Sequence, residues 1–153
     1  MFGPLGQAVF EPELGHDLLL LAGGSGIAGM MAMLEQANQI GYLESHRIEL
    51  IFGVRSGSDI FYQATLQRLA ERHTKNLQIT IALSEQMTDV EWNKTDNVQI
   101  RQGFVHELIS ESSAGANTMA FIAGPPPMVD ASIRELITAK EFAVEKIRYD
   151  KFA

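Results

Sequence analysis

One segment near the amino terminus constrains the fold of this chain more than any other. It runs from Asp17 to Gly29 and reads DLLLLAGGSGIAG, an apolar stretch that ends abruptly in a turn rich in glycine. Because a buried parallel strand is apolar along its whole length, the stretch predicts a central strand that leads straight into a helix. Gly24, Gly26 and Gly29 match the spacing G-x-G-x-x-G, in which a tight turn brings the backbone close to a phosphate group at the helix N-terminus. The segment therefore predicts a nucleotide-binding turn.

Strand-like and helix-like segments alternate along the rest of the chain. After the first strand, we expect strands at 47–54, 77–83, 118–123 and 146–152, and helices at 30–40, 59–72, 104–109 and 128–139. Residues 84–97 are polar and predict an irregular loop at a strand's carboxyl end, where loops often carry function. Five strands alternating with helices predict an α/β fold, a three-layer Rossmann-like arrangement with a five-stranded parallel sheet and helices on both faces.

The composition excludes several classes of function. The 153 residues suit one domain, and the net charge of −7 argues against nucleic-acid binding, because the phosphates would be repelled. The absence of cysteine excludes disulfides and an iron–sulfur cluster within the chain, and it favours a cytoplasmic location. The four histidines lack metal-ligand spacing, and no apolar stretch approaches the roughly 20 residues that span a membrane. We expect neither a metal site nor a membrane partner.

A second turn, at 123–128, reads AGPPPM and follows the expected fourth strand. Three successive prolines fix the backbone and remove three N–H donors, so the turn is stiff. It is either a rigid connection between strand and helix or part of a ligand site. The carboxyl ends of parallel strands meet at one edge, so Gly24, Val54, Ser84 and Gly124 are expected along the same rim, which favours ligand contact.

Together these segments resemble the pyridine-nucleotide domain of the ferredoxin reductase-like flavoproteins. The order and spacing of the matching motifs cover almost the whole chain. The sequence is most similar to the reductase components of bacterial multicomponent oxygenases. The motifs are AGGSGIA at 22–28, GVRSGSDIFY at 53–62, SE at 84–85 with Trp92 after it, GFV at 103–105, AGPPPM at 123–128 and YDKF at 149–152.

The resemblance implies a function and a set of partners. Such proteins take hydride from NAD(P)H onto a bound FAD and pass single electrons to an iron–sulfur centre, in a [2Fe-2S] domain or a ferredoxin, here for an oxygenase. It also implies that residues 1–12 are the tail of a flavin-binding barrel that this chain lacks, and that 13–153 are the NAD(P)H-binding domain. We therefore expect the isolated chain to bind nucleotide but to be inactive without its flavin domain.

The resemblance and the glycine-rich turn together indicate the site residues. Asp150 and Phe152 match the family's terminal acid and aromatic residue, which implies a position near the nicotinamide and the flavin ring. Ala123 stands where the family often has cysteine, and Gly29 where it often has proline, so no thiol assists hydride transfer. The expected cofactor-binding residues are Gly23, Gly24, Ser25, Gly26, Ile27, Arg55, Ser84, Glu85, Ala123, Gly124, Pro125 and Met128.

The coenzyme preference depends on Arg55 and Glu85. An arginine near the end of the second strand of a Rossmann fold favours the 2′-phosphate of NADPH. In the family that the chain resembles, basic residues after the third strand usually hold this phosphate, and Glu85 would instead repel it. We expect NADH, with NADPH as the alternative, and Arg55 in contact with the pyrophosphate or the adenine.

A second class of function stays open. Ala123 and the missing flavin domain are compatible with a non-catalytic nucleotide-sensing or subunit-interaction module of the same fold. Under the reductase interpretation, Gly26→Val should weaken nucleotide binding and leave the domain folded, because the β-branched side chain would occupy the space of the phosphate.

Overall fold

A parallel sheet forms the middle layer of the computed structural model, which describes residues 10–85 and 95–151. Within these ranges the sheet has six strands: β1 (Asp17–Gly23), β2 (Ile48–Val54), β3 (Leu77–Leu83), β4 (Val98–Gln102), β5 (Thr118–Gly124) and β6 (Ile147–Lys151). Their order across the sheet is β4-β3-β2-β1-β5-β6, and every neighbouring pair is parallel.

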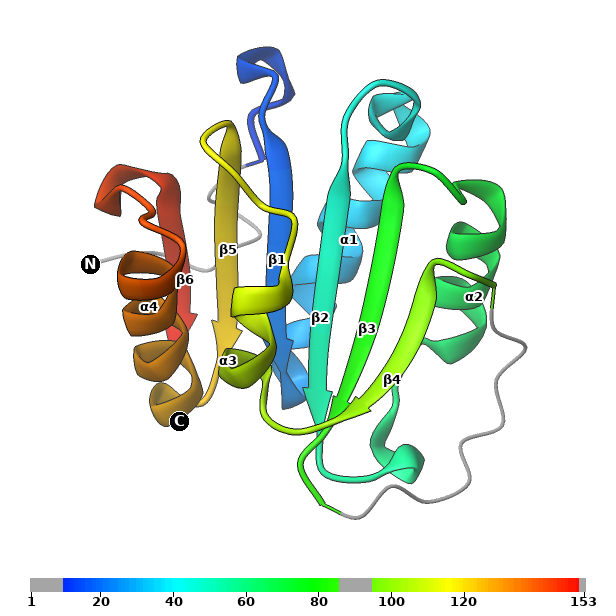
Figure 1. The fold of residues 1–153 in the computed structure, drawn as a ribbon. Coiled ribbons are helices and arrows are strands. Elements are labelled where there is room, and N and C mark those ends of the chain that lie inside the picture. Colours follow the sequence, from blue (N-terminus) through cyan, green and yellow to red (C-terminus); the bar gives the residue numbers. More distant parts are fainter. Residues whose placement is uncertain (1–9, 86–94, 152–153) are drawn as a thin grey trace.

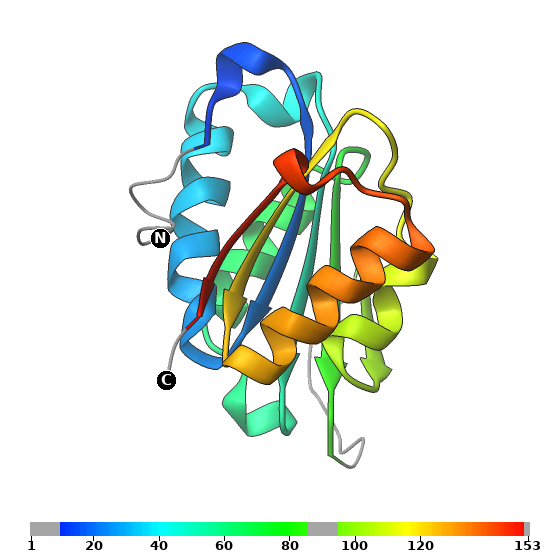
Figure 2. The same ribbon diagram turned by 90° about the vertical axis from the view of Figure 1, so that its left-hand side faces the viewer.

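The helices of the described ranges form the two outer layers. They are α1 (Ile27–Gln39), α2 (Gln63–Arg72), α3 (Val105–Leu108) and α4 (Pro126–Ala139). The first two pack on one face of the sheet and the last two on the other, as Figures 1 and 2 show. Short 3-10 turns lie at Pro12–Leu14, Gly24–Gly26, Tyr42–Glu44, Gly57–Asp59, Ile109–Glu111 and Val144–Lys146.

Each face of the sheet has its own apolar core. In β1, Leu18 and Leu20 point toward α1 and α2, whereas Leu19 and Leu21 point toward α3 and α4. All four leucines are buried. A central strand covered on both faces needs apolar residues at every position rather than at alternate ones, and this explains the uninterrupted run in the sequence.

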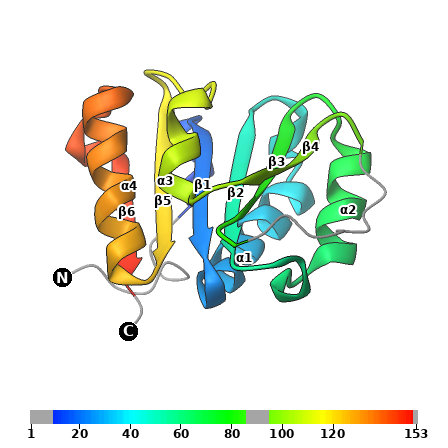
Figure 3. The ribbon, with the colours of Figure 1, turned by 60° about the horizontal axis from the view of Figure 1, so that its bottom comes forward.

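The order of the strands indicates that a ligand would bind in a crevice beside β1. From β1 the chain builds the sheet outward through β2, β3 and β4, and it then returns to the other side of β1 with β5. Ligands of open α/β sheets bind at the carboxyl ends of the strands, where the strand order reverses in this way. That edge lies at the bottom of Figure 1, and Figure 3 turns it toward the viewer.

The predicted α/β class, with a parallel sheet between two helical layers, is confirmed, but the sheet has one strand more than predicted. The additional strand, β4, was not expected because it reads VQIRQ and buries little besides Val98. It is an edge strand that pairs only with β3 in the described structure. Its pattern is therefore too polar to indicate a strand.

All four described helices begin at other positions than expected, and two of them begin three or more residues away. Helix α1 begins at Ile27, three residues before its predicted start, because the glycine-rich turn is itself a helical 3-10 turn that continues into the helix. Helix α2 begins at Gln63 rather than at 59. It is preceded by the 3-10 turn Gly57–Asp59 and by Tyr62, whose φ of 63° is left-handed. In the described ranges, every helix is too short or too polar to cross a membrane.

Candidate functional site

The glycine-rich turn lies at the carboxyl end of β1, beside the crevice. Gly23 ends the strand, and the turn Gly24–Gly26 leads directly into α1. Gly24 is exposed and has a φ of +56°, a conformation that glycine adopts without steric cost. No side chain caps the 3-10 turn or α1, but the N–H group of Ile27 already donates to the carbonyl of Gly24, so donors for an anion are expected at the turn itself, which no other residue covers at Gly24 and Ser25. Ser25 is also exposed, whereas Ile27 is buried and anchors the helix in the core.

Gly26 has a packing role that the sequence did not reveal. A Cβ atom on Gly26 would lie 2.6 Å from the carbonyl carbon of Ala123 and closer still to its oxygen. These are backbone atoms of β5, which cannot rotate away. Gly26 therefore lets the turn pack against the neighbouring strand, so Gly26→Val should destabilise the domain as well as weaken nucleotide binding.

The second turn lies next to the first, at the carboxyl end of β5. Ideal Cβ atoms on Gly23 and Gly124 would both collide with the sulfur of Met128, at 2.7 Å in the case of Gly23. The thioether of half-buried Met128 therefore packs over both turns. Ala123 is 1% exposed, and its side chain faces Gly26. Ala123 can thus affect the site only indirectly, through its packing against Gly26.

The prolines of the second turn determine where an anion can bind. Pro125 precedes α4, and the helix begins with Pro126 and Pro127, so these three positions offer no N–H group. The N-terminus of α1 has no proline and no side-chain cap. Of the two neighbouring turns, only the glycine-rich turn consists of residues that all carry a backbone N–H group, which favours it as the phosphate site.

Arg55 and Glu85 form an ion pair at the ends of β2 and β3. Arg55 Nε and Nη2 lie 3.0 and 2.9 Å from Glu85 Oε1. The pairing of the two strands continues beyond their ends, because the N–H groups of Ser84 and Glu85 donate to the carbonyls of Val54 and Arg55. The two residues, to which the sequence analysis gave separate roles, are therefore direct partners.

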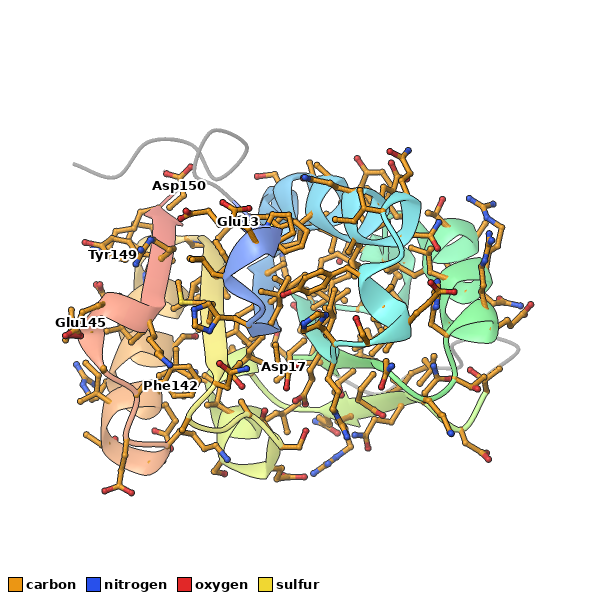
Figure 4. The ribbon with its side chains drawn as sticks, turned by 90° about the horizontal axis from the view of Figure 1, so that it is seen from above. Glu13, Asp17, Phe142, Glu145, Tyr149 and Asp150 are labelled. Carbon is orange, nitrogen blue, oxygen red and sulfur yellow. The ribbon has the colours of Figure 1, made fainter. Side chains whose placement is uncertain are left out.

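Asp150 lies on the far side of β5 from the glycine-rich turn. It is half-buried in β6 and stands in register with Ala123. Residues in register on parallel strands point to the same face, so Asp150 is on the α1 side of the sheet, as Figure 4 shows. Phe152, the other residue expected near the flavin, lies outside the described residues.

Three exposed aromatic residues lie at this edge and were not expected as site residues. Phe104 is 56% exposed and stacks on His106, with ring centroids 5.8 Å apart. The N–H group of Gly103, just before it, donates to the carbonyl of Leu83 at the end of β3. Phe61 and Tyr62 line a hollow of about 370 Å³ together with Ser25, Ile27 and Ala28. The sequence analysis quoted all three residues within the motifs at 53–62 and 103–105 but gave their rings no role.

The titratable groups that burial perturbs lie at the opposite, amino edge of the sheet. Burial lowers the pKa of His73, whose ring nitrogen Nε2 lies 2.7 Å from Asn38 Oδ1. Burial also raises the pKa of the Tyr42 phenol, which donates to the carbonyl of His16. Within residues 10–85 and 95–151, no three acidic or histidine side chains lie close enough together to bind a metal ion.

The strand order, the uncapped helix beside the glycine-rich turn and the stiff neighbouring turn define a dinucleotide-binding α/β domain. A family model described as an oxidoreductase NAD-binding domain matches residues 20–133, and the chain belongs to this family. The predicted NAD-binding domain and its resemblance to the reductase components of oxygenases are confirmed.

Curated relatives are reductase components of oxygenases. The chain is 32% identical over 142 residues to DmpP, the reductase component of phenol 2-monooxygenase from Pseudomonas sp. (strain CF600). It is also 32% identical over 152 residues to the electron transfer component of toluate 1,2-dioxygenase from Pseudomonas putida. The matches cover 92% and 99% of this chain but 38% and 41% of the relatives. The chain thus spans about two fifths of their length.

Solved structures agree on the fold. The cytochrome P450 reductase GcoB from Amycolatopsis superimposes with a TM-score of 0.73 at 22% identity, over 99% of this chain and 40% of that one. The CS-b5R domains of human Ncb5or, in their NAD⁺ form, superimpose with a TM-score of 0.71 at 25% identity, over 94% of this chain and 39% of that one.

Proposed function

We propose that this domain presents NADH to an FAD-containing domain of a reductase, which passes the electrons through an iron–sulfur centre or ferredoxin to an oxygenase. The observation that carries the proposal is the glycine-rich turn before α1, which has no side-chain cap and is exposed at Gly24 and Ser25, at the edge beside β1 where the strand order reverses. The reductase-component names of the curated relatives support the rest. In this proposal residues 1–12 are the tail of a flavin-binding barrel and 13–153 the nucleotide domain.

The residues at the carboxyl edge fit a dinucleotide. A Cβ on Gly24 would have no atom within 4 Å, so there is room above the turn for a phosphate. We assign the pyrophosphate to the backbone of Gly24–Gly26 and to the first turn of α1, with Ser25 as a hydroxyl donor. Bound NADH supplies the hydride and FAD accepts it, so the domain's task is to orient the nicotinamide.

The two halves of the dinucleotide extend in opposite directions from the turn. We assign the nicotinamide half to the side of Gly124, Pro125 and Met128, with Asp150 on the next strand. The adenosine half then lies over the ends of β2 and β3. There the exposed ring of Phe104 offers a stacking surface, and Ser84 and Glu85 offer acceptors to the ribose hydroxyls. Glu85, which is paired with Arg55, leaves no free cation for a 2′-phosphate at this position in the described structure, and this favours NADH over NADPH.

A pair of glycine variants tests the phosphate site. Gly24→Ala places a methyl group where we assign the pyrophosphate, so NADH affinity should fall by at least about tenfold, the loss of one charge-assisted hydrogen bond. Gly15→Ala is the matched control, because Gly15 has a similar φ of +70° and its Cβ would meet only His46, at 3.8 Å. Equal NADH affinity of the two variants in calorimetry would overturn the assignment.

The alternative, a non-catalytic nucleotide-sensing or subunit-interaction module, makes a different prediction for Asp150. In the reductase, Asp150→Asn should slow the reduction of FAD by NADH more than it weakens NADH binding, when measured in a protein that also contains the flavin domain. A sensing module has no such step. The proposal includes a cytoplasmic location, which the cysteine-free sequence supports because a reducing compartment makes disulfides unavailable.

A further inference from the structure

We propose that Glu85 discriminates against NADPH chiefly by occupying Arg55, so that Arg55 is a latent ligand for the 2′-phosphate. The inference rests on the proposed function, because it requires the adenosine half of the dinucleotide to lie over the ends of β2 and β3. It changes the expected role of Arg55, which was a contact with the pyrophosphate or the adenine.

The backbone brings the two side chains together. The parallel register of β2 and β3 runs from Ile48 opposite Leu77 to Val54 opposite Leu83. Beyond the strands, two backbone hydrogen bonds still join the segments, because the N–H groups of Ser84 and Glu85 donate to the carbonyls of Val54 and Arg55, both at 3.0 Å. Arg55 and Glu85 are therefore held next to each other by backbone hydrogen bonds directly beyond the ends of β2 and β3.

The guanidinium of Arg55 is already engaged. Its Nε and Nη2 both point at Glu85 Oε1, at 3.0 and 2.9 Å, which uses one of the edges by which the guanidinium could bind a phosphate and neutralises its charge. The side chains are 79% and 54% exposed, and an ion pair so exposed contributes little to folding. Stabilisation of the fold therefore does not explain why the pair is present, and variants at either position should remain folded.

Charge balance separates this mechanism from simple repulsion. An unpaired Glu85 would repel a 2′-phosphate, but beside Arg55 the pair is close to neutral for an approaching anion. What NADPH loses is then an available cation. If Glu85 becomes neutral, Arg55 is released and binds the phosphate. If repulsion alone operated, the gain from neutralising Glu85 would not depend on Arg55.

A double-mutant cycle distinguishes the two mechanisms. The wild-type chain, Glu85→Gln, Arg55→Gln and the double variant are titrated calorimetrically with NADPH and NADH at one low ionic strength. We expect Glu85→Gln to raise the NADPH/NADH affinity ratio at least about fivefold, as for a charge-assisted contact at a partly exposed site. The gain should vanish in the Arg55→Gln background. A gain of equal or greater size in that background overturns the proposal, as does no gain in Glu85→Gln.

A second set of ligands tests whether the change in affinity depends on the 2′-phosphate alone. Adenosine 2′,5′-bisphosphate should follow the NADPH pattern across the four chains, and 5′-AMP should not. In the Glu85→Gln background, Arg55→Lys should keep part of the gain, because lysine supplies the charge without the planar fork. Raising the salt concentration should weaken the gain. If the wild-type chain binds NADH but Glu85→Gln does not gain affinity for NADPH, only this inference is refuted. If the wild-type chain does not bind NADH, the proposed function is refuted as well.

Discussion

Replacing Gly26 by alanine should destabilise the domain far more than the addition of one methyl group suggests. The new Cβ would lie 2.6 Å from the carbonyl carbon of Ala123 and 3.0 Å from its Cβ. Since Ala123 belongs to β5, which pairs with β1 on one side and β6 on the other, neither the strand nor the turn can move alone. Overpacking of this kind costs about 1–3 kcal/mol, and we expect about 3 because the colliding atoms are backbone.

The comparison variant is Gly24→Ala in the same turn. Its Cβ would meet nothing within 4 Å, so only the left-handed φ of +56° is penalised, by about 1 kcal/mol. For a domain of this size, melting temperatures should fall by about 6–12 °C in Gly26→Ala and about 2–4 °C in Gly24→Ala. Thermal unfolding followed by circular dichroism measures both. If Gly26→Ala melts as high as Gly24→Ala, the close contact with β5 is not what requires glycine at this position.

Three further changes test other parts of the structure. Leu20→Ala, in the core between β1 and α1, should lower the free energy of unfolding by about 2–5 kcal/mol in urea titrations, and a loss below 1 would contradict tight packing there. His73 has a lowered pKa in the folded state, so the unfolded chain binds more protons just below pH 6.5; stability should fall as the pH drops through this range, and His73→Gln should flatten that dependence. Met128→Ala should melt lower than Met128→Leu, because leucine still fills the space over Gly23 and Gly124; equal melting temperatures would dismiss the packing role of the thioether.

The fold was predictable where burial leaves its mark on the sequence. The strands β1, β2, β3 and β5 are buried on both faces and read as apolar runs, and the turns after β1 and β5 carry glycine and proline for steric reasons. Strand β4 escaped prediction because Arg101 and its neighbours lie at an edge where apolar residues are not required. Helix α2 was placed four residues too early because nothing in the sequence indicates the left-handed conformation of Tyr62.

The candidate site was predictable in its parts but not in its internal contacts. The glycine-rich turn and the AGPPPM turn were expected on one rim, and the structure brings them into contact through Met128. The pairing of Arg55 with Glu85 depends on β3 lying next to β2, which the sequence does not specify. The packing of Gly26 against Ala123 likewise depends on β5 being the other neighbour of β1. Both contacts require the strand order.

A calorimetric titration of the chain with NADH and with NADPH, at one fixed low ionic strength, tests the central claim most directly. The structure predicts saturable binding of NADH at a single site and weaker binding of NADPH, since Arg55 is held by Glu85. Circular dichroism of the same sample establishes that the chain is folded. A folded chain that binds neither nucleotide, or that prefers NADPH, would contradict the account.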